Sequence, residues 1–287
     1  MGENKVHYYW LDLVRFTAAF LVLICHFRGA FFVEYTLLPA EQKNPLIFAF
    51  YSLTRLGNEA VLIFFVMSGF LVGGKAIERL QQGVFDIKGY AIDRTVRIML
   101  PLISALLLFI PVAIIQGFCI DWKAWLGNLF SLQGISKKVD KIFLWGGFIV
   151  MICFIILLQL TSGSRLNEGT AISQYLPNRQ ALELLFAFFF SLFLQQLVII
   201  KPTKKWTLKL NEIGTKLAAF SYTLYLTHVL VLRMLEYYNA PKSESVDFIS
   251  ISWYIGELTI ALLVAYVVYW CFEKRTAEVK SWIKSKL

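Results

Sequence analysis

The sequence has few of the residues on which soluble and disulfide-stabilised folds depend. Only 16% of its 287 residues are charged, and its four cysteines have no paired spacing. Because Cys25, Cys119, Cys153 and Cys271 lie in or beside apolar stretches, they are better interpreted as packing residues than as a disulfide framework or metal site. Cys25 is also poorly placed to be a thiol nucleophile activated by the adjacent His26, since neighbouring helical positions point about 100° apart.

Several chemical motifs are absent as well. The chain has no glycine-rich nucleotide loop, no zinc-ligand spacing and no serine-hydrolase elbow. The first apolar stretch carries charges and lacks a small-residue cleavage site, so we expect it to remain as a membrane helix. No internal repeat or linker tract divides the chain. These absences predict one membrane domain, residues 1–287, whose chemistry comes from isolated polar side chains and needs no metal.

What the sequence does contain is a large share of apolar residues. Hydrophobic residues make up 58% of the chain and aromatic residues 16%, which is more than a soluble domain needs. Apolar stretches that we interpret as helices occur at 8–27, 58–73, 96–115, 117–133, 142–160, 182–200, 217–235 and 251–272. We therefore predict an all-α, polytopic membrane bundle with about eight transmembrane helices.

The basic residues predict how this bundle is oriented. The net charge of +9 is concentrated between apolar stretches, which is typical of membrane orientation and anionic lipid contact and not of nucleic-acid binding. If 117–133 crosses the bilayer, all the basic clusters share one side, as the positive-inside rule favours. These clusters are 75–97, 201–216 and 274–286. Both termini are then cytoplasmic, and 28–45, 161–181 and 236–250 lie outside an inner (plasma) membrane.

The first apolar stretch contains three ionisable residues, Asp12, Arg15 and His26. The eleven residues from Arg15 to His26 amount to three helical turns plus about 20°, which places both on one face, roughly 16 Å apart. Asp12 joins that face. A charge near mid-membrane costs about 2.5–3.5 kcal/mol, so chance rarely leaves one there. Arg15 either pairs with Asp12 to hold helices together or helps to line a reaction cavity.

Other polar residues in apolar stretches are further candidates. Ser221, Tyr225 and His228 share a helical face, so His228 is either a packing partner or part of a cavity. Ser68 precedes a glycine, a pair that normally marks close helix packing. Arg94 and Arg97 are three residues apart at the start of a helix, as topology anchors or as anion ligands.

Five strings together resemble the acyltransferase 3 family, the membrane O-acetyltransferases that modify bacterial surface glycans. They are LDLVRF followed by His26, FFVMSGFLVGG, DRTVRIMLP, SYTLYLTH and CFEKRT, in the family's order. The resemblance implies that acetyl-CoA from the cytoplasm donates an acetyl group. The acceptor it implies is a hydroxyl of an extracytoplasmic glycan or lipid-linked saccharide.

The resemblance also assigns roles. Arg15 and His26 match the family's arginine–histidine pair, and Arg94 and Arg97 match its cytoplasmic double arginine. A histidine near neutral pKa can take the proton of an attacking hydroxyl. Arg15 could orient the donor or stabilise developing charge, and arginines suit the phosphates of coenzyme A. Further polar residues expected in the cavity are Asp12, Ser68, Ser221, Tyr225 and His228.

One departure from the family keeps alternatives open. The family's Trp-Ser-Leu segment and its following glutamate are missing, and no glutamate occurs between Glu78 and Glu168. A membrane hairpin near residue 135 is therefore expected to be absent. The chain could then be a non-catalytic relative, or one that needs a partner subunit such as a second copy. A small transporter is a further alternative, although the inverted repeats expected of one are not visible.

Overall fold

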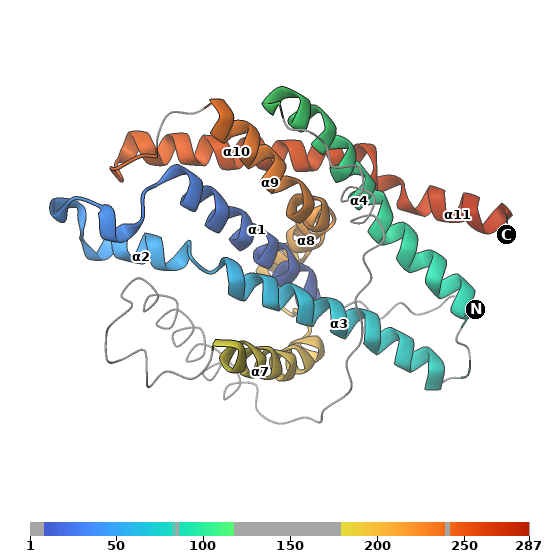
Figure 1. The fold of residues 1–287 in the computed structure, drawn as a ribbon. Helices are drawn as coiled ribbons and strands as arrows, with labels where there is room; N and C mark the ends of the chain where they lie inside the picture. The colour runs from blue at the N-terminus through green and yellow to red at the C-terminus, as the bar shows by residue number, and fades with distance from the viewer. Residues whose placement is uncertain (1–8, 82, 84–85, 118–178, 239–241, 287) are drawn as a thin grey trace. The chain divides into compact units, whose positions relative to one another are not determined.

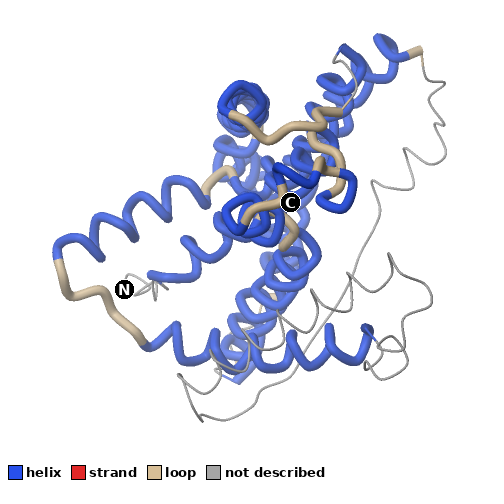
Figure 2. Tube along the Cα trace, turned by 90° about the vertical axis from the view of Figure 1, so that its left-hand side faces the viewer, coloured by secondary structure: helices blue, strands red, loops and turns tan. Residues whose placement is uncertain are grey.

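The computed structural model describes residues 9–81, 83, 86–117, 179–238 and 242–286 (Figure 1). Within these ranges the regular elements are helices (Figure 2). Extended backbone pairs there only at an isolated bridge between Phe32 and Ser243. The all-α prediction is thus confirmed for the described part of the chain.

The N-terminal part contains four α-helices. They are α1 (Tyr9–Phe31), α2 (Pro45–Leu53), α3 (Gly57–Gln81) and α4 (Ile87–Gln116). The sequence predicted α1, α3 and α4 but not α2, which begins where the Asn44 side chain accepts the Ile47 N–H at 2.9 Å. Helix α4 starts nine residues before its predicted start and ends at Gly117, whose φ of 70° suits glycine at a helix C-terminus.

The C-terminal part contains five more α-helices. They are α7 (Arg179–Ile199), α8 (Lys205–Ala218), α9 (Ser221–Tyr238), α10 (Phe248–Cys271) and α11 (Thr276–Lys286). The apolar stretches predicted α7, α9 and α10. Helices α8 and α11 fall in two of the basic clusters and were not predicted, because a search for apolar stretches passes over lysine-rich helices.

Four helical segments of the described chain are long and apolar enough to cross a membrane, namely Trp10–Phe31, Pro45–Phe70, Ile87–Gln116 and Phe248–Lys286. Helices α8 and α9 would add a fifth if they form one broken span. Two further predicted crossings, 117–133 beyond Gly117 and the whole of 142–160, lie outside the described residues. The count of about eight and the cytoplasmic termini therefore stay predictions.

The described residues fall into two compact units, and α1 and α3 each contribute to both. The first unit contains residues 9–18 and 58–74 with α7 and α8. Its core consists of Leu11, Met67, Phe186, Phe190 and Leu194. Helix α8 approaches α1 closely at Gly214, where a Cβ atom would lie 3.1 Å from Leu13 Cβ. The absence of a side chain at Gly214 permits this approach.

The second unit contains residues 19–57, α4, α9, α10 and α11. Helix α9 packs between partners of its own unit, α4 and α10. The Tyr254 hydroxyl of α10 donates to the Ile24 carbonyl of α1 at 3.0 Å. Edge-to-face contacts of Phe32 with Tyr254 and Phe50 complete an aromatic cluster beside the end of α1. These contacts fix the second half of α1 relative to α10. That the whole chain forms one domain stays a prediction.

Candidate active site

Two histidines meet in the second unit, although 202 residues separate them in the sequence. His26 Nδ1 of α1 lies 2.8 Å from His228 Nε2 of α9. The ring planes differ by only 10° and the centroids are 5.1 Å apart. Because the N···N distance and the two ring radii account for the centroid separation, the rings meet edge to edge, in the geometry of a hydrogen bond. His228 is 3% exposed, whereas His26 is an exposed residue.

The backbone of α9 determines which nitrogen carries each proton. His228 Nδ1 lies 2.7 Å from the Tyr225 carbonyl oxygen and 3.3 Å from that of Leu224. A carbonyl only accepts, so His228 Nδ1 carries the hydrogen and, in the neutral ring, Nε2 accepts. His26 Nδ1 must then donate to His228. This leaves the Nε2 lone pair of neutral His26 available to take a proton from another molecule.

Two other candidates, Ser221 and Tyr225, lie on α9 with His228. The Tyr225 ring lies 5.9 Å from the His228 ring, centroid to centroid, and Ser221 is completely buried. Thr223 donates to Glu273 at 2.5 Å, which connects the start of α9 to the segment after α10. The shared face predicted for Tyr225 and His228 thus corresponds to a direct ring contact, and Tyr225 also anchors the histidine chain through its carbonyl group.

Arg15 has two hydrogen-bond partners in the first unit. Its Nη2 donates to Asp12 Oδ1 at 3.0 Å and to the Ala218 carbonyl at 3.3 Å. Thr215 donates to the second Asp12 oxygen at 3.1 Å. A guanidinium at the last carbonyl of α8 compensates the partial negative charge of that helix end. These contacts match the interpretation in which Arg15 and Asp12 hold helices together. Ser68 lies exposed on α3.

Arg94 and Arg97 lie in a basic cluster at the start of α4. Arg94 stacks its guanidinium over the Tyr90 ring at 5.4 Å, and Arg97 is exposed. Asp93, beside Arg94, forms ion pairs with Lys280 and Lys284 of α11. Sequence reasoning missed the two lysines, although their i,i+4 spacing could have indicated a common helical face.

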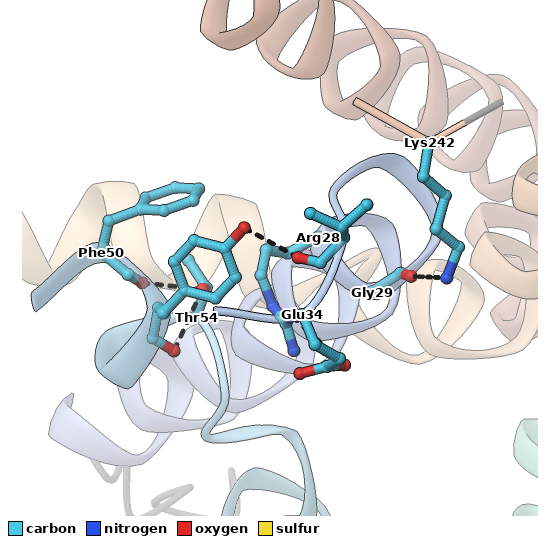
Figure 3. A network of polar contacts seen from close by, with 8 residues as sticks. Arg28, Gly29, Glu34, Phe50, Thr54 and Lys242 are labelled. Atoms are coloured by element: carbon cyan, nitrogen blue, oxygen red, sulfur yellow. Dashed lines mark hydrogen bonds and ion pairs between the residues drawn. The ribbon is translucent and has the colours of Figure 1, made fainter. Parts of the chain in front are cut away.

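A polar network holds the end of α1, two residues beyond His26 (Figure 3). Arg28 is 5% exposed, lies 3.7 Å from the Glu34 carboxylate and stacks over the Tyr51 ring at 5.2 Å. Lys242 donates to the Gly29 carbonyl at 2.6 Å. The backbone bridge at Ser243 adds two hydrogen bonds, of 2.8 and 3.1 Å, to Phe31 and Val33. The helix that carries His26 is therefore held at its C-terminal end. Sequence reasoning had placed Arg28 in a loop.

No group of three or more histidine, cysteine or acidic side chains among the described residues is arranged to hold a metal ion. The geometry instead offers a proton acceptor, His26, and cations suited to phosphates. Comparison with known proteins decides which chemistry this resembles. Residues 8–135 match the family model of an acyltransferase domain, that of the acyltransferase 3 family.

The resemblance found in the sequence is thereby confirmed over these residues, and the match supports acyl transfer onto a hydroxyl. It includes Arg15, His26, Arg94 and Arg97, whereas His228 lies beyond it. No curated protein and no solved structure matches the chain. The match ends at residue 135, where the sequence departs from the family's pattern, and the predicted loss of a hairpin there lies outside the described residues.

Proposed function

We propose that the chain transfers an acetyl group from acetyl-CoA to a hydroxyl of an extracytoplasmic glycan or lipid-linked saccharide. The observation that carries this proposal is the hydrogen-bonded chain from His26 through His228 to the Tyr225 carbonyl. It gives His26 a free Nε2 lone pair on a helix that matches an acyltransferase domain. A proton acceptor of this kind is what an alcohol needs in order to attack a thioester.

The reaction balances with His26 as the only residue that exchanges a proton. The acceptor hydroxyl gives its proton to His26 Nε2 while its oxygen attacks the thioester carbonyl carbon. The tetrahedral intermediate then expels the coenzyme A sulfur as the C–S bond breaks. The sulfur takes the proton back from His26 Nε2, which leaves an ester and free coenzyme A. No metal, oxidant or covalent enzyme intermediate enters these steps.

His228 acts on the reaction through His26. When His26 holds the extra proton, its Nδ1–H donates from a cationic ring, and such hydrogen bonds are stronger than neutral ones. His228 Nε2 accepts this bond at 2.8 Å, and the Tyr225 carbonyl holds His228 in the accepting tautomer. His228 is therefore a positioning residue that stabilises imidazolium formation.

The cationic residues have separate parts in the proposal. Arg94 and Arg97 bind phosphates of acetyl-CoA on the cytoplasmic side, since guanidinium groups pair well with phosphate oxygens. Arg15 holds the C-terminal end of α8 through the Ala218 carbonyl. Tyr225 borders the histidine pair.

The test uses the full chain purified in nanodiscs, with radiolabelled acetyl-CoA and a saccharide acceptor. We expect His26→Ala to bind acetyl-CoA as the unmodified chain does but to transfer about 10²–10⁴-fold more slowly, the usual contribution of a general base. Free imidazole should restore part of this loss. Near-normal turnover by His26→Ala would overturn the mechanism.

The same assay separates the alternative of a partner-dependent or non-catalytic relative. Transfer by a monomer, one copy per nanodisc, supports the mechanism above. Transfer only after two copies are joined would show that the acceptor site needs a second subunit. Acetyl-CoA binding without transfer in either state would identify a non-catalytic relative.

A further inference from the structure

Helix α11 brings two lysines to the first turns of α4, the helix that carries Arg94 and Arg97. Asp93 Oδ1 lies 3.5 Å from Lys280 Nζ and 3.3 Å from Lys284 Nζ. The two lysines are four residues apart and so project from one face of α11. A single carboxylate oxygen of Asp93 therefore pairs with two ammonium groups from the C-terminal helix.

The positive charge at this place exceeds what Asp93 can balance. Arg94 follows Asp93 directly, and Arg97 lies one helical turn on, near enough to Lys280 for the two like charges to repel each other. Two lysines thus share one carboxylate, and two arginines lie beside it on the same helix. Like charges held this close destabilise a fold unless counter-ions bind between them.

The accessibility of the four side chains shows where such an anion would bind. The Lys280 side chain is 17% exposed and Lys284 is 48% exposed, so Lys280 lies against the protein while Lys284 reaches outward. Arg97 is exposed, and Arg94 is held against the Tyr90 ring at 5.4 Å. The cluster therefore combines Lys280 and Arg94, which lie against the protein, with Lys284 and Arg97, whose more exposed side chains can reach a ligand from outside.

We propose that Lys280 and Lys284 complete the donor site, binding phosphate groups of acetyl-CoA together with Arg94 and Arg97. The proposal rests on the proposed function, because it takes acetyl-CoA as the donor. Coenzyme A carries a diphosphate and a 3′-phosphate, two separated anionic groups that match cations from two helices. Arginine forks suit paired phosphate oxygens, and the lysines supply point charges. Helix α11 is then part of the binding site and not only a basic tail.

The same phosphate chemistry could come from anionic lipid headgroups. Trp282, 64% exposed on α11, suits a helix near the membrane interface. Binding of acetyl-CoA and binding of lipid headgroups differ in what changes their affinity. Acetyl-CoA binding depends on its 3′-phosphate whatever the lipid, whereas headgroup binding depends on the lipid composition of the nanodisc.

The experiment measures affinity for acetyl-CoA and for its 3′-dephospho analogue, using the full chain in nanodiscs of phosphatidylcholine alone or with phosphatidylglycerol. The test variant is Lys280→Gln with Lys284→Gln. Its control is Lys274→Gln with Lys286→Gln, which removes the same charge from nearby positions that make no ion pair with Asp93. Lys280→Arg with Lys284→Arg keeps the charge and checks that packing is intact.

We expect the test variant to bind acetyl-CoA about 10–100-fold more weakly in both lipid compositions, as for two lost charge-assisted contacts. It should also lose most of the preference for acetyl-CoA over the 3′-dephospho analogue, while the control and the arginine variant keep their affinity.

Equal affinity in the test and control variants, with the unmodified chain binding normally, would overturn this inference and leave the proposed function intact. A variant whose acetyl-CoA affinity is normal but whose thermal stability no longer depends on phosphatidylglycerol would assign the cluster to lipid and overturn it as well. Failure of the unmodified chain to bind acetyl-CoA would overturn both proposals.

Discussion

Replacement of His228 by alanine gives a quantitative test of the histidine pair. The substitution removes the acceptor that lies 2.8 Å from His26 Nδ1 and the imidazole bound to the Tyr225 carbonyl. His26 itself remains, so a proton acceptor is still present. What is lost is the group that fixes its tautomer and stabilises its protonated form. The rate of transfer should therefore fall, but by less than when His26 is removed.

The size of the effect follows from how the hydrogen bond changes during the reaction. Between neutral rings the bond contributes about 0.5–1.5 kcal/mol, and with a charged donor about 1.5–3 kcal/mol. Only the difference, about 1–1.5 kcal/mol, lowers the barrier, which corresponds to about a tenfold change in rate. Free choice between two tautomers reduces the reactive fraction by about another factor of two. We expect kcat of His228→Ala to fall about 10–30-fold.

The assay measures kcat at saturating acetyl-CoA in nanodiscs, beside donor affinity and the thermal midpoint of each variant. Thr227→Val is the matched control. Thr227 is as deeply buried as His228 and hydrogen-bonds only along its own helix, to the Thr223 carbonyl at 2.8 Å. Its kcat should stay within about twofold of normal. His228→Gln retains an oxygen acceptor and should recover part of the lost rate.

Two outcomes would refute the reasoning. If His228→Ala turns over normally while His26→Ala does not, His26 works without the partner found in the structure. If His228→Ala is as inactive as His26→Ala although it folds and binds the donor, His228 contacts the substrate itself and is not a positioning residue.

Two further predictions concern stability. Gly214→Ala should lower the free energy of unfolding by about 1–3 kcal/mol, because the added Cβ would lie 3.1 Å from Leu13 Cβ. In the control Gly256→Ala, the added Cβ meets nothing within 4 Å, so this variant should keep its stability. Chemical denaturation in detergent measures both variants, and equal stability would contradict the packing of Gly214. Hydrogen bonding, first from the Ser250 backbone N–H at 2.8 Å, lowers the pKa of Asp247 at the start of α10. Because this pKa is lowered in the folded state, the Asp247 carboxylate stabilises the fold at pH values above its ordinary pKa near 4. That stabilisation is lost as the pH falls through the lowered pKa, so the thermal midpoint of Asp247→Asn should decline less in acid than that of the unmodified chain.

Apolar length and periodicity are local properties, and they were sufficient for most of the helices. The interior of α1, α3, α4, α7, α9 and α10 could be predicted from apolar stretches, since a membrane helix satisfies its backbone internally and must present apolar side chains. Helix α8 could not, because its lysines interrupt the apolar pattern and its place is set by contacts with α1. Gly214 lies against Leu13, and Thr215 reaches Asp12, contacts that no hydropathy pattern reveals.

The contacts of the candidate site also divide into local ones, which the sequence indicates, and contacts between distant residues, which it does not. The sequence placed Asp12 and Arg15 three apart on one helical face and left open whether they pair, and the structure shows the pair at 3.0 Å. The sequence named His26 and His228 one at a time, and it left open whether His228 is a packing partner or part of a cavity. No spacing rule connects residues 202 positions apart, and only the packing of the second unit brought His26 Nδ1 to 2.8 Å from His228 Nε2. Likewise, the lysines of α11 share a face by local geometry. That this face meets Asp93 was decided by the contact of α11 with α4, because a side chain's partner across helices depends on how the whole core packs.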